Sequence, residues 1–300
     1  MAYSFLANPS ATADELRRWN LHTKKSLGQH FLVDDNVVGR ILELSEVGPG
    51  DTVLEVGPGI GTLTVALLAA GADVVAVEKD DDLHPVIRDN ASLATDGDDT
   101  GRLALLGMDA VSLDSDTLLS AASSLEGGGE PQKFVSNLPY SVAATLILEY
   151  LQRIGCLQME CVMVQSEVAD RICARPGTKD YGAYTVKVRL LATPGGSFPV
   201  APSCFSPQPR VMSKVLRLDR IDASGDYATR QAACMMADAA FYQRRKTIRN
   251  SMQSYLSRLD VEEERVDAVL REVGVDPRSR GEQHDVDEFM AMGEAFLQME

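Results

Sequence analysis

The segment Asn137-Leu138-Pro139-Tyr140 carries the most distinctive chemistry in the chain. The exocyclic amine of adenine is a weak nucleophile, because its lone pair is delocalised into the ring. The side-chain oxygen of Asn137, together with a backbone carbonyl freed by the adjacent proline, can accept both N–H bonds of that amine and favour a pyramidal nitrogen. The ring of Tyr140 can stack on a flipped-out base, worth about 1–3 kcal/mol. The segment therefore predicts a site that binds an adenine whose exocyclic amine acts as the nucleophile. The simpler alternative is an ordinary Asn-Pro turn.

A glycine-rich turn, with Gly57, Gly59 and Gly61, lies upstream between a predicted strand and a predicted helix. This order lets a ligand approach backbone N–H groups without meeting Cβ atoms. A dinucleotide-binding fingerprint has a small residue at its sixth position, where this chain has Thr62. The turn therefore favours the nucleoside loop of S-adenosylmethionine (SAM) methyltransferases over an NAD site. A tight turn that binds no ligand is a third alternative.

Acidic and amide side chains follow three of the predicted strands. These side chains are Glu78, Asp109 and Asn137. The carboxyl ends of the strands in a doubly wound sheet meet at one edge, and ligands bind there. Glu78 also follows the glycine turn by about twenty residues, where a carboxylate can bind the hydroxyls of a ribose. The coincidence of the three is stronger evidence for a ligand site than any one of them.

Strands and helices alternate along the first two thirds of the chain. The strands are expected at residues 52–56, 73–77, 103–107, 133–136 and 160–165, and helices at 62–70, 83–90, 143–153 and 167–174. The alternation predicts an α/β fold with a Rossmann-like, mainly parallel sheet, as in class I SAM-dependent methyltransferases.

The rest of the chain is expected to form separate parts. We expect an N-terminal extension at residues 1–22, a SAM-binding catalytic domain at 23–218 and a small all-helical C-terminal domain at 219–300. In the C-terminal domain four residues recur at helical spacing and should face a core. They are Ile248, Met252, Tyr255 and Leu259.

Composition limits the class of protein. The chain has 300 residues, of which 45% are hydrophobic, and this suits one full α/β domain with a smaller one. It has no apolar run of the ~20 residues that a membrane span needs and no signal-like N-terminus, so we expect a cytoplasmic protein. Its five cysteines form no Cys-x-x-Cys pair, and we expect neither a disulfide framework nor a metal site.

The charge is unevenly distributed. The net charge of −15 argues against a nucleic-acid partner. However, residues 16–33 contain four bases and no acid, and residues 181–218 and 239–259 each contain five bases and no acid. An acidic protein of this kind can still present a basic face to phosphates. The alternative is a chance variation among solvated helices.

The chain resembles the KsgA (RsmA) family of ribosomal RNA small-subunit adenine dimethyltransferases, over residues 24–289. The resemblance rests on Gly28-Gln29-His30-Phe31-Leu32, on residues 55–61, on residues 137–140, and on the Phe-Tyr-Gln-Arg-Arg-Lys-Thr-Ile-Arg-Asn run at 241–250. The run at 241–250 and the Phe-Ser-Pro-Gln-Pro-Arg-Val run at 205–211 are more specific to this family than to SAM enzymes in general. Four positions depart from the family pattern, which often has Asn at His30, Asn-Ile at Ser141-Val142 and an uninterrupted proline run at Gln208.

The resemblance implies a role for each matching residue. SAM would be bound by Gln29, His30, Leu32, Gly57, Gly59, Gly61, Glu78, Asp109 and Asn137. Among these, Glu78 would bind the ribose hydroxyls, Asp109 the adenine amine of SAM, and Gly57 would lie against its methionine portion. Catalysis would involve Asn137, Leu138, Pro139, Tyr140 and Phe205, with Phe205 sandwiching the target base against Tyr140; the alternative for Phe205 is a core position. RNA would be contacted by Lys24, Lys25, Arg244, Arg245, Lys246 and Arg249, the last four on a basic helix; a solubilising helix face is the alternative.

These implications define an expected function. The enzyme would dimethylate two adjacent adenosines near the 3′ end of 16S rRNA in the small ribosomal subunit, with SAM as methyl donor, acting as a monomer. The alternatives are a large-subunit rRNA adenine methyltransferase of the antibiotic-resistance type and an RNA-binding assembly factor that does not catalyse. A dehydrogenase is a more distant alternative, because Thr62 breaks the dinucleotide fingerprint.

Overall fold

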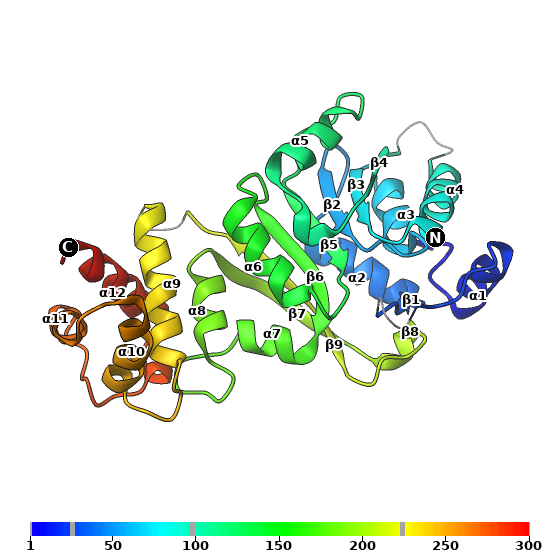
Figure 1. Cartoon of the computed structure of the whole chain (residues 1–300). Helices are drawn as coiled ribbons and strands as arrows, with labels where there is room; N and C mark the ends of the chain where they lie inside the picture. Colours follow the sequence, from blue (N-terminus) through cyan, green and yellow to red (C-terminus); the bar gives the residue numbers. More distant parts are fainter. Residues whose placement is uncertain (1, 25–27, 96–99, 223–225, 300) are drawn as a thin grey trace. The chain divides into compact units, whose positions relative to one another are not determined.

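The chain forms two compact units in a computed structural model that describes residues 2–24, 28–95, 100–222 and 226–299 (Figure 1). Unit 1 comprises residues 1–169 and 194–220, and unit 2 comprises residues 170–193 and 221–300. Residues 170–193 therefore group with the C-terminal helices, whereas the sequence placed them in the catalytic domain. They include helix α8, which packs on α9 within unit 2.

The helices and strands, in chain order, are α1 (Pro9–Arg18), β1 (Phe31–Leu32), α2 (Asp35–Ser45), β2 (Thr52–Val56), α3 (Thr62–Ala69), β3 (Asp73–Glu78), α4 (His84–Ala94), β4 (Leu103–Gly107), α5 (Ser115–Ser123), β5 (Lys133–Asn137), α6 (Ala143–Arg153), β6 (Met159–Gln165), α7 (Ser166–Ile172), α8 (Ala183–Arg189), β7 (Ala192–Val200), β8 (Phe205–Ser206), β9 (Ser213–Arg220), α9 (Tyr227–Phe241), α10 (Ile248–Leu256), α11 (Glu263–Glu272) and α12 (Val286–Gln298). The structure contains every strand and helix that alternation predicted over residues 52–174, and it adds α5 between β4 and β5.

A seven-stranded sheet in the order β4-β3-β2-β5-β6-β9-β7 forms the centre of unit 1. Strands β4, β3, β2, β5 and β6 are parallel, and β9 is antiparallel to β6. Strands β2 and β3 are buried along their whole length, which accounts for their continuous apolar runs. The expected class I methyltransferase architecture is confirmed, with the carboxyl ends of β4, β3, β2 and β5 along one edge.

The N-terminal residues are part of unit 1. Helix α1 begins at Pro9, and Asn8 caps it. Leu6 packs with Phe31, Ile60 and Leu83 in a small core cluster. The pairing of β1 with β8, two strands of two residues each, was not predicted, because such short strands have no periodic pattern.

Two predictions about unit 2 were wrong. Residues 242–247 form a turn between α9 and α10, so the expected basic helix is instead a basic turn followed by Arg249 on α10. The α10 core face contains Ile248, Met252 and Leu256, while Leu259 lies past the helix end and is exposed. The helical periodicity stops at Leu256, and Leu259 is in a 3₁₀ turn. Among the described residues, no helix is long and apolar enough to span a bilayer.

Candidate active site

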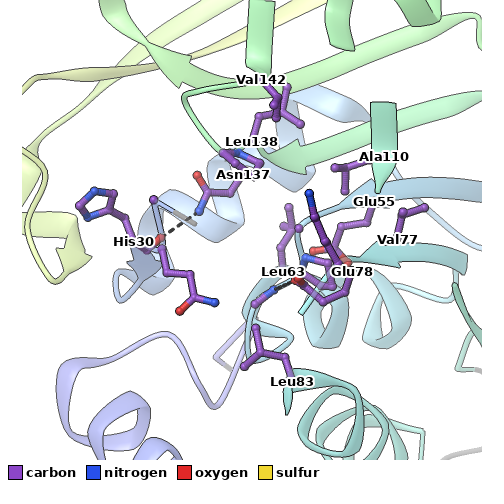
Figure 2. Close-up of a pocket in the computed structure, with 18 of the residues that line it drawn as sticks. His30, Glu55, Leu63, Val77, Glu78, Leu83, Ala110, Asn137, Leu138 and Val142 are labelled. Carbon is purple, nitrogen blue, oxygen red and sulfur yellow. Dashed lines mark hydrogen bonds between the residues drawn. The ribbon is translucent and has the colours of Figure 1, made fainter. Parts of the chain in front are cut away.

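A cavity of about 250 Å³ lies at the carboxyl edge of the sheet in unit 1 (Figure 2). The structure brings together there eleven of the predicted site residues: Gln29, His30, Leu32, Gly57, Gly59, Glu78, Asp109, Asn137, Leu138, Pro139 and Tyr140. Gly61 and Phe205 are not among the residues that line it. Strand ends therefore position the site as the sequence suggested.

The glycines allow close packing at the cavity wall. A Cβ on Gly59 would lie 3.1 Å from the Phe31 ring, and one on Gly57 would lie 3.2 Å from Pro139; both glycines have positive φ. Their N–H groups donate within the protein, Gly57 to the Val77 carbonyl and Gly59 to Glu78. The loop therefore offers close approach more than free N–H donors. Gly61 caps α3 in a left-handed conformation and shapes the helix start.

Glu78, the last residue of β3, is a buried acid that lines the cavity. Its Oε1 accepts the Asp80 N–H at 2.8 Å, and its Oε2 accepts the Gly59 N–H at 3.4 Å. Burial raises the pKa of this carboxyl, and the backbone hydrogen bonds oppose that rise. The remaining lone pairs of its oxygens are suited to accept hydrogen bonds from a vicinal diol.

Asp109, just past β4, is more exposed than Glu78. Its Oδ2 accepts from the Lys79 ammonium at 2.7 Å, and its Oδ1 accepts the Val111 N–H at 3.1 Å. The hydrogen bond from Lys79 holds the pKa of Asp109 below its usual range. A carboxylate here suits an exocyclic amine, because each of its oxygens accepts one of these bonds and has a further lone pair.

Asn137, the last residue of β5, is oriented by its own amide. Its Nδ2 donates to the His30 carbonyl at 3.3 Å, as Figure 2 shows, which leaves Oδ1 without a protein donor among the described residues. The Leu138 N–H donates to the Met163 carbonyl. The first hydrogen bonds of the turn that follows go to the Pro139 carbonyl, which accepts from the Val142 and Ala143 N–H groups. Asn137 and Leu138 both line the cavity, and Asn137 Oδ1 is a hydrogen-bond acceptor there.

Phe205 is placed differently from the prediction. It is only 2% exposed, pairs with Leu32 in the β1–β8 ladder and belongs to the main core of unit 1. The alternative of a core phenylalanine describes this position. The ring that faces Tyr140 is instead that of His30, with centroids 5.8 Å apart and planes inclined by 27°.

Several of the predicted RNA-binding side chains are engaged within the protein. The Lys24 ammonium contacts Asp80 at 2.6 Å and Asp82 at 2.7 Å, and Gln29 donates to Asp80. Lys25 lies outside the described residues. Arg244 donates to the Tyr181 carbonyl at 2.9 Å and contacts Glu282 at 3.2 Å, with further bonds to the carbonyls of residues 178 and 179.

Arg249 is held in the same way. It makes a bidentate pair with Asp267 of α11, at 2.5 and 2.7 Å, and so links α10 to α11. Arg245 and Lys246 are exposed and have no acidic partner among the described residues. Some basic side chains of this region are therefore paired within the protein, and others have no acidic partner among the described residues.

Sequence reasoning missed three kinds of site residue. Thr62, singled out only as a break in the fingerprint, lines the cavity, and its buried Oγ1 has no hydrogen-bond partner among the described residues. Lys79 pairs with Asp109, and Leu83 and Met108 add apolar wall. A hydroxyl, two carboxylates and apolar walls fit a ligand with a sulfonium amino acid, a ribose and an adenine.

Glu55 predicts a pH dependence of stability. It is buried beneath the cavity and accepts the Thr64 hydroxyl at 2.6 Å, and burial raises its pKa to about 8. Between the unfolded pKa and about 8 the folded state binds a proton that the unfolded state has released. Stability should therefore fall across this range as pH rises. Glu55→Gln should remove this contribution. The unfolding midpoint of the variant, relative to that of the wild type, should therefore rise between pH 5 and pH 9. Parallel curves would show that Glu55 titrates normally.

The fold and the cavity together define a class I SAM-dependent methyltransferase. Residues 20–294 match the family described as "Ribosomal RNA adenine dimethylase". The chain belongs to this family, and the resemblance stated from its motifs is confirmed. A relative from Kineococcus radiotolerans, described as "Ribosomal RNA small subunit methyltransferase A", is 39% identical over 96% of this chain and 91% of its own length.

Two solved structures share the fold at lower identity. A dimethyladenosine transferase from Plasmodium falciparum has a TM-score of 0.71 and 21% identity, over 88% of this chain and 96% of its own. The 23S rRNA methyltransferase ErmE has a TM-score of 0.62 and 24% identity, over 89% of this chain and 100% of its own. One of these structures is titled by 23S rRNA and the other by dimethyladenosine alone, so the shared fold does not identify the RNA substrate.

Proposed function

We propose that this chain transfers methyl groups from SAM to two adjacent adenosines near the 3′ end of 16S rRNA in the small ribosomal subunit. Each 6-amino group receives two methyls, as a step of ribosome biogenesis. The observation that carries the proposal is the acceptor Asn137 Oδ1, which has no protein donor among the described residues and belongs to a cavity also lined by Leu138, Tyr140, Glu78 and Asp109.

Some residues of the cavity would bind the methyl donor, SAM, and others would bind the adenine that accepts the methyl group. Glu78 would hold the ribose hydroxyls of SAM and Asp109 its adenine amine, while the bare backbone at Gly57 and Gly59 admits the chain of the amino acid. When bound, SAM supplies a methyl on a sulfonium, which transfers by direct in-line displacement. Rate enhancement then comes from positioning and from acceptors preorganised for the developing charge.

Asn137 and Leu138 hold the attacking amine. Their oxygens accept its two N–H bonds and turn the lone pair away from the ring and toward the methyl. The proton to be lost becomes acidic once the nitrogen carries the new methyl, so the site works without a strong general base. A second transfer needs room beside Asn137 for one N-methyl group.

Labelling of isolated ribosomal subunits tests the choice of substrate. Under-methylated small and large subunits are incubated separately with the protein and methyl-labelled SAM. We expect label in adenosines of the small-subunit rRNA only. Label confined to the large subunit would replace this proposal with the antibiotic-resistance type of activity.

The exposed part of the basic turn supports a contact with rRNA. Arg245 and Lys246 are free to bind phosphates, and Arg258 joins them through the exposed Tyr242, whose hydroxyl accepts from Arg258 at 2.9 Å. Phosphate contacts fix the position of an RNA without reading its sequence. We propose that these side chains, rather than Arg244 and Arg249, help to hold the small subunit.

Charge reversal distinguishes free cations from structural ones. The double variant Arg245→Glu/Lys246→Glu should weaken small-subunit binding. The slope of log affinity against log salt concentration should become less steep by about one to two, because about two phosphate contacts are lost. The control Arg249→Ala breaks the pair with Asp267 and should mainly lower the unfolding midpoint of unit 2. An unchanged salt slope in the double variant would indicate a solubilising surface.

The remaining expectations are part of the same proposal. The protein would act in the cytoplasm, where small subunits are assembled, and as a monomer. Sedimentation of the free protein across a range of concentrations tests the monomer.

A further inference from the structure

The side-chain amide of Gln29 is fixed at both of its polar atoms. Its Oε1 accepts the Lys24 N–H at 2.8 Å, and its Nε2 donates to Asp80 Oδ2 at 3.0 Å. Because the oxygen must face the N–H group and the nitrogen must face the carboxylate, these partners allow one orientation of the amide. Gln29 lines the cavity at the sheet edge and also a neighbouring cavity of about 250 Å³. Its position therefore defines part of the wall between the two cavities.

Asp80 is a buried acid that follows Glu78 by two residues. It is 7% exposed and does not itself line the cavity at the sheet edge. Its carboxylate accepts from the Lys24 ammonium at 2.6 Å and from Gln29, while its backbone N–H donates to Glu78 Oε1 at 2.8 Å. Asp80 therefore connects Lys24 and Gln29, which precede β1, to the acid that is expected to bind the ribose hydroxyls.

Lys24 supplies the positive charge that faces this buried acid. Its ammonium also contacts Asp82 at 2.7 Å, but the Asp82 side chain is 65% exposed, whereas that of Asp80 is 5% exposed. Water can replace an exposed ion pair at little cost, whereas a buried carboxylate that loses its cation is destabilised strongly. The contact with Asp80 is therefore the one through which Lys24 should affect the site.

We propose that Lys24 and Asp80 are positioning residues for SAM. Lys24 holds the Asp80 carboxylate in its buried position, and Asp80 in turn orients Gln29 at the cavity wall and Glu78 at the ribose. This role replaces the expected contact between Lys24 and RNA. The inference rests on the proposed function, because it takes Glu78 as the acid that binds the ribose hydroxyls of SAM.

The test is a double-mutant cycle read by calorimetric titration with SAM. Lys24→Met and Asp80→Asn should each raise the dissociation constant of SAM about tenfold, because each removes a hydrogen bond between charged groups. The double variant should stay within about threefold of Asp80→Asn, because Lys24 acts through Asp80 and the two effects are not independent. At saturating SAM the kcat for under-methylated small subunits should stay within about threefold of wild type, because Asn137 is intact.

Two further variants serve as controls for the cycle. Lys24→Arg keeps the cation and should restore the dissociation constant of SAM to within about threefold of wild type. Asp82→Asn makes the same chemical change as Asp80→Asn at the exposed partner of Lys24, and it should change SAM affinity less than about twofold. The unfolding midpoint of each variant without SAM shows whether it is folded, and Lys24→Met alters a partly exposed side chain if Asp80→Asn does not fold.

The salt dependence of small-subunit binding decides between the two roles of Lys24. We expect Lys24→Met to leave that salt slope unchanged. The inference is overturned if Lys24→Met lowers the slope and leaves SAM affinity unchanged, since Lys24 would then bind phosphate. It is also overturned if the two losses of SAM affinity multiply in the double variant, or if Asp82→Asn loses as much as Asp80→Asn. SAM affinity is measured without ribosomes, so a wild-type protein that binds SAM but methylates no small subunit would overturn the proposed function alone.

Discussion

Asn137→Ala should lower methyl transfer to the small subunit by at least about 100-fold, while the variant still binds SAM. Loss of one preorganised hydrogen-bonding group at the reacting atoms typically costs a factor of about 10²–10³ in rate. Asn137 Oδ1 is such a group, because the bond from Nδ2 to the His30 carbonyl fixes its direction. SAM binding should weaken but persist, because Glu78 and Asp109 lie on other strands.

Single-turnover transfer and calorimetric titration with SAM measure the two effects separately. The matched control is Asn36→Ala, the same deletion at an exposed position of α2, which should leave both quantities unchanged. Undiminished transfer by Asn137→Ala would show that the amine is held by other groups. Complete loss of SAM binding would indicate that Asn137 binds SAM and not the target amine.

Glu78→Ala should weaken SAM binding by about 10- to 100-fold. Hydrogen bonds to a charged group contribute about 1.5–3 kcal/mol, and about 1.4 kcal/mol corresponds to a factor of ten. The carboxylate of Glu78 is almost wholly buried, so water cannot easily replace it as an acceptor for the ribose hydroxyls. At saturating SAM the rate of transfer should recover substantially, because the amine acceptors are intact.

Asp81→Asn is the control for the change in charge. Asp81 lies on the loop that follows β3, but its side chain is 90% exposed and does not line the cavity. Its SAM affinity should stay within twofold of wild type in a calorimetric titration. An equal loss of SAM affinity in both variants would mean that the negative charge of the loop acts at a distance, and that Glu78 does not bind a ribose hydroxyl.

The edge of the sheet could be predicted because its signals are local. Strands β3 and β5 each end in a polar residue, β4 is followed closely by Asp109, and parallel pairing brings these ends together. Glu78, Asp109 and Asn137 therefore reached one cavity without any knowledge of tertiary contacts. The start of helix α2 carries a local signal of the same kind, since Asp34 caps it through the Asn36 and Val37 N–H groups.

The roles of the cations and of Phe205 could not be read in this way. Arg244 and Arg249 look equivalent to Arg245 in the sequence, but their partners at Glu282 and Asp267 lie 38 and 18 residues away. The burial of Phe205 depends on the pairing of two strands of two residues each. Thr62 shows a related limit, because an orphaned hydroxyl is visible only once its surroundings are known.

Mass mapping of the methylated nucleotides tests the central claim most directly. Small subunits from a strain that lacks this methylation are treated with the protein and SAM, and the rRNA is digested and sequenced by mass. The account predicts two adjacent adenosines near the 3′ end, each heavier by two methyl groups, in wild-type reactions and not with Asn137→Ala. Methyl groups on other nucleotides, on ribose, or only in large-subunit rRNA would contradict it.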